Sequence, residues 1–508
     1  MRARAALALA VAAAVIVLAG CAPETSADWT PASWSVVGTV TADAPEVQDA
    51  EASTVAMRIR NDDVGIDARW ASLPGDQPIN AAIETAVRSA IAAQADATGA
   101  TYHPQVFAAG AGLGDRGCAP GATTAKAIDI LGSRSGAVVV CEVTVARGSL
   151  FAETLRTVTG AGGVVTSDHT QVLYTDLATG AVGTEADLFG DTGALWVAMV
   201  DALRRDFGSL SLGAVQPPTA EQLASFASAL GGSRFAQGSV AVPVPADLQA
   251  PELDGLVRWQ ARGEDRQLYV TFTPDEVDGA LTDLGRALAS ASGAFAGPTS
   301  AGAGFEHIPC DLVPCMAMTL DDGPSNLTPT FLDVLRDAQS AATFFMLGQN
   351  AQRHPDTVAR VAAEGHEVGN HTWDHKYLTD LTDAEVQAEL GDTRALLQRL
   401  SGQSVPFFRP PGGFVDDHVI ALAGQSAILW SVDTRDWAGP TASDLARYAI
   451  DTPQQGTVML MHDIQSVTES VFGQVVAGLR DRGFQLVTIN ALFGGAVPAG
   501  QVRHGPVH

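Results

Sequence analysis

The C-terminal part of the chain alternates between short apolar runs and amphipathic stretches. The amphipathic stretches, such as Pro329–Ala338 and Asp383–Leu400, have the spacing of apolar residues that is typical of helices. Strands that alternate with helices form a parallel sheet, either open or closed into a barrel. The runs that predict strands lie near Met316–Leu320, Ala342–Leu347, Glu367–Gly369, Pro406–Phe408, Ala427–Val432, Thr457–Met461 and Phe484–Thr488.

Polar clusters follow five of these predicted strands, at the point where each strand ends. In a (β/α) barrel the active site lies at the C-terminal ends of the strands. A globular domain without a functional site gives no reason for polar clusters to recur at these strand ends. We therefore expect these side chains to meet in one site. In chain order they are Asp321-Asp322, His371 with His375, Arg409, Asp433 to Trp437, and His462-Asp463.

The region 51–288 mixes helical and strand-like patterns and predicts an α+β domain of unknown role. One predicted helix starts near Asn80, another covers Leu195–Phe207, and strands are expected at Ala137–Val145 and Gln267–Phe272. Residues 289–309 are rich in Ala, Gly, Ser and Pro, which is typical of a flexible linker. The boundary of the C-terminal domain, 310–508, is placed after this linker.

The N-terminus reads as an export signal. Two arginines precede the apolar run Ala5–Gly20, and the sequence Leu18-Ala19-Gly20-Cys21 resembles the lipobox of bacterial lipoproteins. We therefore expect a signal peptide at 1–20 and a linker at 21–50 that is lipid-anchored at Cys21 to the outer face of the cell membrane. The alternative is an ordinary signal peptide followed by an unrelated cysteine.

Composition narrows the possible functions. The 508 residues include 30 Lys plus Arg and 57 Asp plus Glu, a formal net charge of −27, which disfavours a nucleic-acid partner. A hydrophobic share of 46% is enough for sizeable cores. Besides Cys21 there are four cysteines, and in an exported chain we expect the pairs Cys118–Cys141 and Cys310–Cys315. A cysteine-rich zinc site is the weaker alternative, because no Cys-x-x-Cys occurs.

Two of the polar clusters suggest a metal site. His371 and His375 are four positions apart, so on a helical turn both imidazoles would point the same way. Two histidines and one carboxylate form an open metal site that leaves room for water and substrate. Taken alone, each cluster also has an explanation that needs no metal. Asp321 and Asp322 would then lie in a solvated turn, and the two histidines would lie on the surface.

Taken together and in order, the clusters resemble the five motifs of the polysaccharide deacetylases, also called family 4 carbohydrate esterases. The resemblance covers nearly all of 310–508 and implies a distorted (β/α) barrel. It also implies that Asp322, His371 and His375 bind a divalent metal, zinc in many members, with Co, Mn or Ni as alternatives. Asp321 is then the general base that takes a proton from the attacking water.

The same resemblance implies roles for the later motifs. Arg409 corresponds to the arginine that orients the base, and Asp436 to the aspartate that orients His462. His462 is then the general acid that protonates the leaving amine. Trp437 and Leu460 correspond to residues that line a small apolar pocket for the acetyl methyl group.

Two positions depart from the family pattern. Gly412 stands where tyrosine usually follows the second proline of the third motif. Its backbone N–H can still stabilise the oxyanion, but the tyrosine side chain that would position substrate is lost. Leu320 replaces a common phenylalanine, which is a packing change of little catalytic weight.

These observations predict an enzyme that removes N-acetyl groups from a cell-wall glycan, with peptidoglycan N-acetylglucosamine as the first choice. Chitin oligomers, an exopolysaccharide or acetylated xylan are alternatives, as is an amidase acting on small molecules. A different class of function is a non-catalytic lipoprotein that binds or senses the cell wall.

Overall fold

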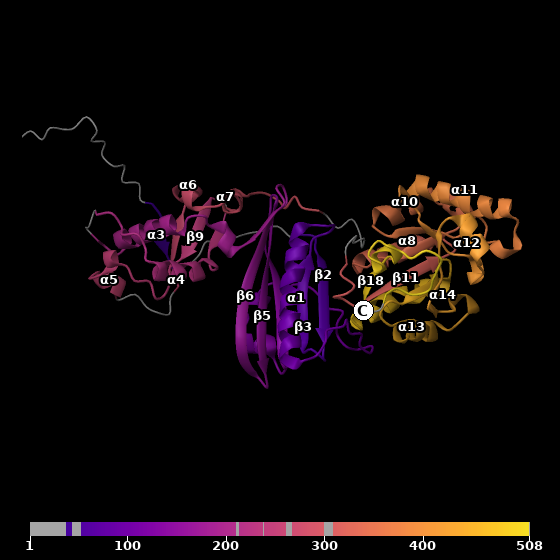
Figure 1. The fold of residues 1–508 in the computed structure, drawn as a ribbon, viewed down its shortest axis with the longest axis horizontal. Coiled ribbons are helices and arrows are strands. Elements are labelled where there is room, and N and C mark those ends of the chain that lie inside the picture. The colour runs from indigo at the N-terminus through magenta and orange to yellow at the C-terminus, as the bar shows by residue number, and fades with distance from the viewer. Residues whose placement is uncertain are drawn as a thin grey trace, which may run out of the picture.

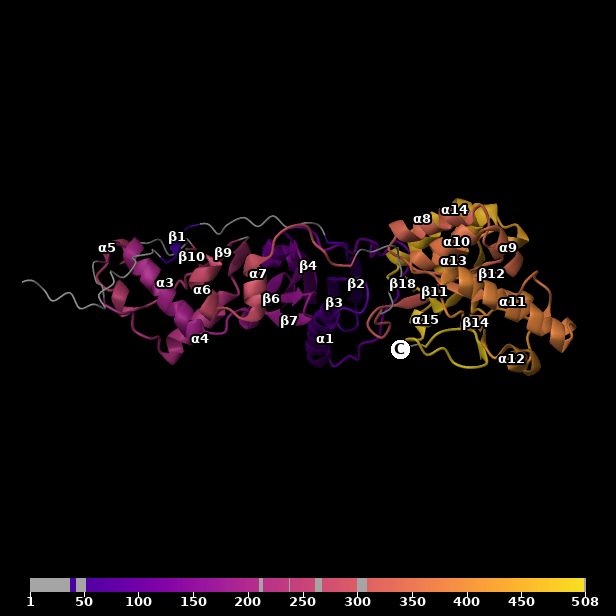
Figure 2. The same ribbon diagram turned by 90° about the horizontal axis from the view of Figure 1, so that it is seen from above.

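The computed structural model describes residues 37–42, 52–209, 213–236, 238–260, 267–298 and 308–506. The predicted signal peptide, Cys21 and most of the predicted anchored linker lie outside these residues. Within the described ranges the strands form three separate sheets, and the three units built on them follow one another along the long axis of the molecule (Figures 1 and 2). None of the helices in these ranges is long and apolar enough to cross a bilayer.

The four-stranded unit lies at one end of the molecule (Figure 1). Its antiparallel sheet has the order β1 (Thr39–Thr41), β10 (Tyr269–Phe272), β9 (Ser239–Pro243) and β8 (Arg234–Ala236). The predicted helix after Leu195 is confirmed as α3, and its residues Leu195, Met199 and Leu203 are buried. The helices of this unit are α3 (Thr192–Asp206), α4 (Ala220–Leu230), α5 (Val257–Gln260), α6 (Pro274–Val277) and α7 (Asp283–Ser290).

The six-stranded unit lies in the middle and is inserted in sequence between β1 and the rest of the four-stranded unit. The long helix α1 (Pro78–Thr98), which confirms the helix predicted to start near Asn80, covers one face of its sheet and buries Ile83, Val87 and Ile91 (Figure 1). A short helix, α2, covers Ala127–Leu131. The strands, in sheet order, are β2 (Val55–Asn61), β3 (Ile66–Ser72), β4 (Gly136–Arg147), β5 (Leu150–Ala161), β6 (Val164–Asp176) and β7 (Ala181–Thr184).

The region predicted as one α+β domain therefore contains strands of two sheets. The hydrophobic core under α1 continues to barrel residues such as Phe345 and Val458, and the core of the four-stranded unit includes Leu150 and Tyr174 of the six-stranded sheet. The described start of the predicted linker is not detached, because Phe295 forms a β-bridge with Gly148 of the six-stranded unit. The domain boundaries drawn from the sequence remain a prediction.

The C-terminal unit is a parallel α/β barrel, which confirms the predicted fold class. Strand β11 lies between β17 and β12, and the order continues through β13, β14 and β15 to β19, while β18 pairs with the start of β11. The strands are β11 (Cys315–Asp321), β12 (Thr343–Met346), β13 (Glu367–Asn370), β14 (Phe407–Phe408), β15 (Ser426–Ile428), β16 (Val432–Asp433), β17 (Val458–His462), β18 (Gln485–Val487) and β19 (Gln501–Val502).

The barrel is distorted where it closes. We predicted one strand over Ala427–Val432, but the segment forms two short strands. β15 pairs with β14, whereas β16 pairs with β17 on the other side of the barrel. A single bent segment thus bridges the two ends of the sheet. Ile428 still pairs with Val502 of β19, and Leu429 follows outside β15, yet the backbone carbonyls of both residues face the barrel interior, where they accept from Arg409.

Helices surround this barrel (Figure 1). The predicted helix after Asp383 is confirmed as α11. It begins with a capping box between Thr382 and Glu385 and ends at Gly402, which adopts the left-handed conformation that favours glycine. The helices are α8 (Thr328–Asp337), α9 (Gly348–Arg353), α10 (Pro355–Ala363), α11 (Asp383–Ser401), α12 (Asp417–Ala423), α13 (Ala442–Asp451), α14 (Ser466–Asp481) and α15 (Ile489–Leu492).

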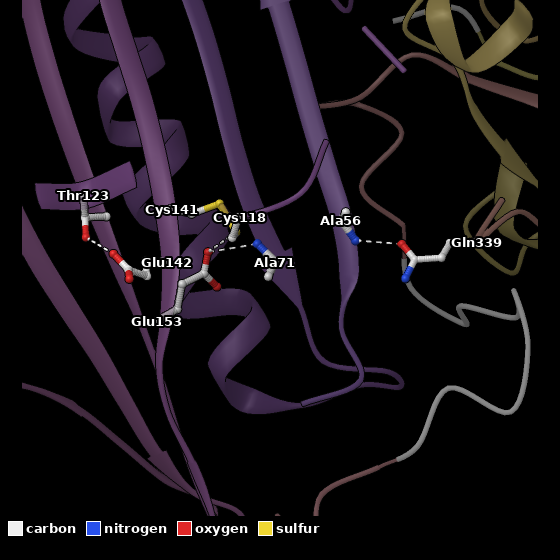
Figure 3. Close-up of a disulfide and its surroundings, with 8 residues drawn as sticks. All are labelled: Ala56, Ala71, Cys118, Thr123, Cys141, Glu142, Glu153 and Gln339. Carbon is white, nitrogen blue, oxygen red and sulfur yellow. Dashed lines mark hydrogen bonds between the residues drawn. A yellow bond between two sulfur atoms is a disulfide. The ribbon is translucent and has the colours of Figure 1, made fainter. Parts of the chain in front are cut away.

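Both predicted disulfides are present. Cys310–Cys315 lies immediately before and at the start of β11, and Cys118–Cys141 ties a loop of the six-stranded unit to β4. Figure 3 shows the Cys118–Cys141 disulfide beside Glu153, whose Oε1 accepts a hydrogen bond from the Ala71 N–H at 2.8 Å. Glu153 is fully buried, and this burial raises the pKa of its carboxyl well above the usual value.

The six-stranded unit is hydrogen-bonded to the barrel. The Ala56 N–H in β2 donates to Gln339 Oε1 at the end of α8 (Figure 3). The principal link is Arg116, a buried side chain of the loop that follows α1. It donates to Gln485 Oε1 at 2.7 Å and to the carbonyls of Arg480 and Phe484, each at 2.8 Å. These bonds join the central unit to the region around β18, at the entry side of the barrel.

Replacing Arg116 by methionine should destabilise the protein by about 3 kcal/mol or more. The substitution keeps the stem and leaves two buried acceptors, Gln485 Oε1 and the Phe484 carbonyl, without this donor, while the Arg480 carbonyl still accepts from the Gly483 N–H. Each unsatisfied buried group costs about 1–3 kcal/mol. Urea unfolding of the mature chain measures this. Arg447→Met is the matched control, because Arg447 is exposed and pairs with the exposed Asp444. Equal unfolding midpoints in the two variants would contradict the interpretation.

Candidate active site

The aspartate pair lies where β11 ends. Asp321 is the last residue of the strand and is buried, and Asp322 follows with a φ of +72°. Asn350 Nδ2 donates to the Asp322 carbonyl at 2.7 Å and holds this unusual backbone conformation. The turn continues through a cis peptide bond between Gly323 and Pro324. Both carboxylates face His371 Nε2, but Asp321 is also paired with Arg409, whereas Asp322 also faces His375.

The two histidines follow β13 in an irregular loop rather than on the helical turn that we assumed. Thr372 and His375 have φ values of +69°, which no helix accommodates. The loop is held from outside by Glu389 of α11, which accepts hydrogen bonds from the backbone N–H groups of Trp373 and Asp374. With this support the loop, rather than a helical turn, directs the imidazoles of both His371 and His375 toward Asp322.

Asp322 faces both imidazoles. Its Oδ1 lies 3.4 Å from His371 Nε2 and 3.5 Å from His375 Nε2. His371 Nδ1 is 2.7 Å from the Arg409 carbonyl. Because a carbonyl only accepts, Nδ1 carries the hydrogen and Nε2 keeps its lone pair toward Asp322. The ligand-type atoms of the three residues lie within 4.8 Å of one another.

The electrostatics of this trio favour a cation. Burial opposes ionisation of Asp322, but the imidazole of His371 outweighs it and lowers the pKa of Asp322 to about 2. Burial also opposes a charged His371, yet the carboxylates of Asp321 and Asp322 raise its pKa. Asp322 Oδ1 is buried and has no hydrogen-bond partner among the described residues. An orphaned oxygen facing the Nε2 atoms of two imidazoles fits a divalent metal with nitrogen and oxygen ligands.

Asp321 is held by Arg409 inside the barrel. Arg409 Nη1 donates to Asp321 Oδ1 at 2.8 Å and to Thr319 Oγ1 at 2.7 Å. The guanidinium also donates to the carbonyls of Ile428 and Leu429, at 3.0 and 2.9 Å, where the barrel bends between β15 and β16. Arg409 is fully buried, and this network compensates the cost of burying its charge. The other oxygen of Asp321 faces His371 Nε2 at 3.7 Å.

His462 and Asp436 form a second pair, at the end of β17. His462 Nδ1 lies 2.7 Å from Asp436 Oδ1. Asp436 Oδ2 accepts hydrogen bonds from the His462 N–H at 2.8 Å and from Thr468 Oγ1 at 2.6 Å. Burial of His462 favours its neutral form, but the hydrogen bond and charge of Asp436 prevail and raise the pKa of His462 to about 9.

Asp463, next to His462, is fully buried and lies against Gly323. A Cβ at Gly323 would collide with the carboxylate of Asp463, so this turn requires glycine. Thr328 at the start of α8 donates to Asp463 Oδ2. Burial, with the nearby charge of Asp322, raises the pKa of Asp463 to about 7.

The structure thus brings Asp321, Asp322, His371 and His375 into one cluster, with Arg409 attached to it. Asp436 and His462 form an adjoining pair, and the charges of Asp321 and Asp322 contribute to the pKa of His462. Trp437 is 57% exposed, whereas Leu460 is buried in β17.

Several supporting residues were missed by the sequence analysis. Thr319, Glu389 and Thr468 each make a hydrogen bond that positions a site residue or its loop. Thr319 looks like an ordinary strand residue, and Glu389 and Thr468 look like ordinary helix residues. No local pattern reveals their partners, which lie 90, 16 and 32 positions away in sequence.

Comparison with known proteins places this site among deacetylases. A family model described as polysaccharide deacetylase matches residues 310–428. A peptidoglycan-N-acetylglucosamine deacetylase of Bacillus cereus is 35% identical over 186 residues, which are 35% of this chain and 87% of that protein. A peptidoglycan-N-acetylmuramic acid deacetylase of Bacillus subtilis is 34% identical over 35% of this chain and 38% of its own length. A chitooligosaccharide deacetylase of Sinorhizobium fredii is 33% identical over 34% of this chain and 88% of its own length.

Proposed function

Because this chain belongs to the polysaccharide deacetylase family, we propose that it removes N-acetyl groups from the N-acetylglucosamine of peptidoglycan. The observation that carries the proposal is the cluster of Asp321, Asp322, His371 and His375 beside the pair Asp436–His462. One group of residues can hold a metal, and two separate groups can take up and give back a proton. That division is what hydrolysis of an amide requires.

Asp322, His371 and His375 are the residues that would hold a divalent metal, most simply zinc. When bound, such an ion acts as a Lewis acid that polarises the acetyl carbonyl and makes water more acidic. The tautomer of His371 is already set for this role by the Arg409 carbonyl. The two Nε2 atoms that face Asp322 and the orphaned Asp322 oxygen support this assignment.

Asp321 takes the proton from the attacking water. Arg409 binds one oxygen of this carboxylate and leaves the other directed toward the metal ligands, so the base is oriented but still able to accept a proton. His462 gives a proton from Nε2 to the leaving amine, while Asp436 holds its Nδ1–H. Gly412 N–H would stabilise the oxyanion, and Trp437 with Leu460 would line the pocket for the acetyl methyl group.

The pH profile should show an alkaline limit set by His462. As general acid, His462 must be protonated, and its pKa is raised to about 9, so kcat should hold below that pH and fall above it. Replacing Asp436 by asparagine removes the charge that raises this pKa. The falling limb of kcat against pH should therefore move to lower pH in Asp436→Asn. An unmoved limb would mean that another group sets it.

The choice of glycan rests on the relatives. Peptidoglycan deacetylases are among them, and export to the cell wall would bring this chain to the same polymer. The chitooligosaccharide deacetylase makes chitin oligomers the second candidate. An exopolysaccharide and acetylated xylan have less support, and the sensing alternative is disfavoured because each residue of the predicted catalytic set is present.

We also propose that the mature chain is tethered to the outer face of the membrane through lipid on Cys21, which supports a polymer substrate. Replacing Cys21 by alanine should release the protein into the medium or leave it unprocessed. A single acyl chain binds membranes only marginally, so a diacylglyceryl group is expected. Unchanged partitioning of the variant into detergent would contradict lipidation.

Mass spectrometry of glycan fragments tests the proposed activity. The metal-loaded mature chain is incubated separately with peptidoglycan fragments and with chitin oligomers. Loss of an acetyl mass from the N-acetylglucosamine of peptidoglycan is the expected result. Loss from N-acetylmuramic acid or from chitin alone would reassign the substrate, and no loss from any glycan in the wild type would refute the activity.

A further inference from the structure

Two exposed aromatic side chains form a pair beside the candidate site. Tyr377 is 46% exposed and Phe414 is 55% exposed, yet their ring centroids are only 5.1 Å apart in an edge-to-face arrangement. Pairs of this geometry hold each other in place, because the edge of one ring is attracted to the face of the other. The pair therefore presents apolar surface to solvent without being free to collapse into the core.

The pair arises from the same two loops that carry the candidate site. Tyr377 comes two residues after His375, and Phe414 comes five residues after Arg409. The loops follow β13 and β14, which are neighbours in the barrel, so both rings stand at the C-terminal end of the sheet. The two loops are joined at the site itself, where the Arg409 carbonyl accepts from His371 Nδ1 at 2.7 Å.

Gly412 explains why the rings meet there. Its φ is +63°, and a Cβ on it would lie 2.9 Å from the ring of Phe414 and 3.2 Å from the ring of Tyr377. Both distances are too short for a side chain at 412 unless the rings move. The two rings thus occupy the space beside the Gly412 N–H that a side chain at this position would otherwise enter.

We propose that Tyr377 and Phe414 form a subsite that stacks against a pyranose ring of the glycan chain, next to the sugar whose acetyl group is removed. A pyranose ring presents an apolar C–H face and a rim of hydroxyls, which complements an aromatic surface that carries one phenol group. Aromatic side chains have few rotatable bonds, so ordering them on binding costs little entropy. This inference rests on the proposed function and adds the place where the neighbouring sugar binds.

The surrounding charges agree with a neutral ligand. Lys376, between His375 and Tyr377, is paired with Asp374 at 2.9 Å and with Glu389 at 3.2 Å. Its charge is therefore balanced by one carboxylate of the loop and one of α11. The pair itself contains no charged group, which fits an uncharged sugar ring better than an anionic ligand.

Binding to an inactive protein tests the subsite without turnover. The Asp321→Asn variant, loaded with zinc, is titrated in a calorimeter with the single sugar N-acetylglucosamine and with its five-sugar oligomer. Adding Tyr377→Ala and Phe414→Ala should weaken binding of the five-sugar oligomer by roughly tenfold, a typical effect of truncating a central aromatic contact. Binding of the single sugar, which is too short to reach the subsite, should change much less. Equal affinity of the longer oligomer with and without the aromatic pair would overturn the proposal.

Kinetics on otherwise wild-type protein separate this subsite from the chemistry. The same double replacement should raise KM for the five-sugar oligomer roughly tenfold and leave kcat within about twofold, as expected for a contact made equally in ground and transition states. Tyr377→Phe and Phe414→Tyr keep the stacking surfaces and should restore KM. Tyr448→Ala is the control, since Tyr448 on α13 is 45% exposed and should leave both constants unchanged. A fall in kcat with unchanged KM would also refute the subsite.

Absence of acetate release by the wild type would count against the proposed function. The calorimetric comparison would still decide whether the aromatic pair binds the sugar chain.

Discussion

Replacing Asp321 by asparagine is expected to lower kcat by a factor of about 10²–10⁴, the usual cost of losing a general base. Asparagine keeps the shape of the side chain and one oxygen toward Arg409 Nη1, but it cannot accept a proton from water. The metal content should remain stoichiometric, because Asp322, His371 and His375 are untouched. Added metal should not restore the rate.

Asp322→Asn is the matched control for this prediction, since the two residues are neighbours with the same side chain. It removes a charged ligand, so metal affinity should fall first and activity with it, and excess metal should restore part of the rate. Metal titration of activity in both variants, with metal content measured in parallel, distinguishes the roles. If the Asp321 variant were the one rescued by metal, the roles would be reversed. If both variants kept wild-type turnover, the proposed mechanism would fail.

Replacing His371 by alanine should remove bound metal and activity together. The imidazole supplies a ligand atom from the buried side of the cluster, and its Nδ1–H also binds the Arg409 carbonyl. Losing a Lewis acid worth several kcal/mol corresponds to a fall in kcat of about 10²–10³ or more. His418→Ala is the control, because His418 is exposed and pairs with Asp383 outside the cluster. Full metal occupancy in His371→Ala would remove this residue from the set of ligands.

The barrel could be predicted from its apolar runs because central strands such as β11 and β12 are short, continuous and buried throughout. Where a strand bends, the same reasoning fails. The run Ala427–Val432 is apolar throughout, yet the chain turns within it to reach β14 on one side and β17 on the other. Local hydrophobicity reports burial and carries no information on which neighbour a residue pairs with.

The metal-ligand candidates were identified correctly as neighbours, but the helical turn assumed for the two histidines was wrong. Their spacing suggested a helical turn, whereas the loop is irregular and depends on Glu389 for its shape. Residues that carry chemistry can be recognised in the sequence by their type and by their position directly after a strand. Supporting residues such as Thr319 and Glu389 do not, because a threonine in a strand or a glutamate on a helix is common and its partner is distant in sequence.

At Gly412 the sequence suggests a missing side chain but does not reveal which residues fill its space. The sequence indicates the loss of a tyrosine side chain there, and so a loss of substrate contacts. In the folded chain the rings of Tyr377 and Phe414 fill the neighbouring space. Tyr377 is 35 positions from Gly412 and on a different loop, so only the packing of the two loops reveals this arrangement.

The most direct test of the central claim, that Asp322, His371 and His375 hold a metal on which glycan deacetylation depends, is acetate release by the mature chain before and after metal loading. The protein is stripped with a chelator, assayed on peptidoglycan fragments, and assayed again after stoichiometric zinc is added. We predict negligible acetate release from the stripped protein and full recovery on loading. Equal release before and after zinc, or release in neither case, would contradict the account.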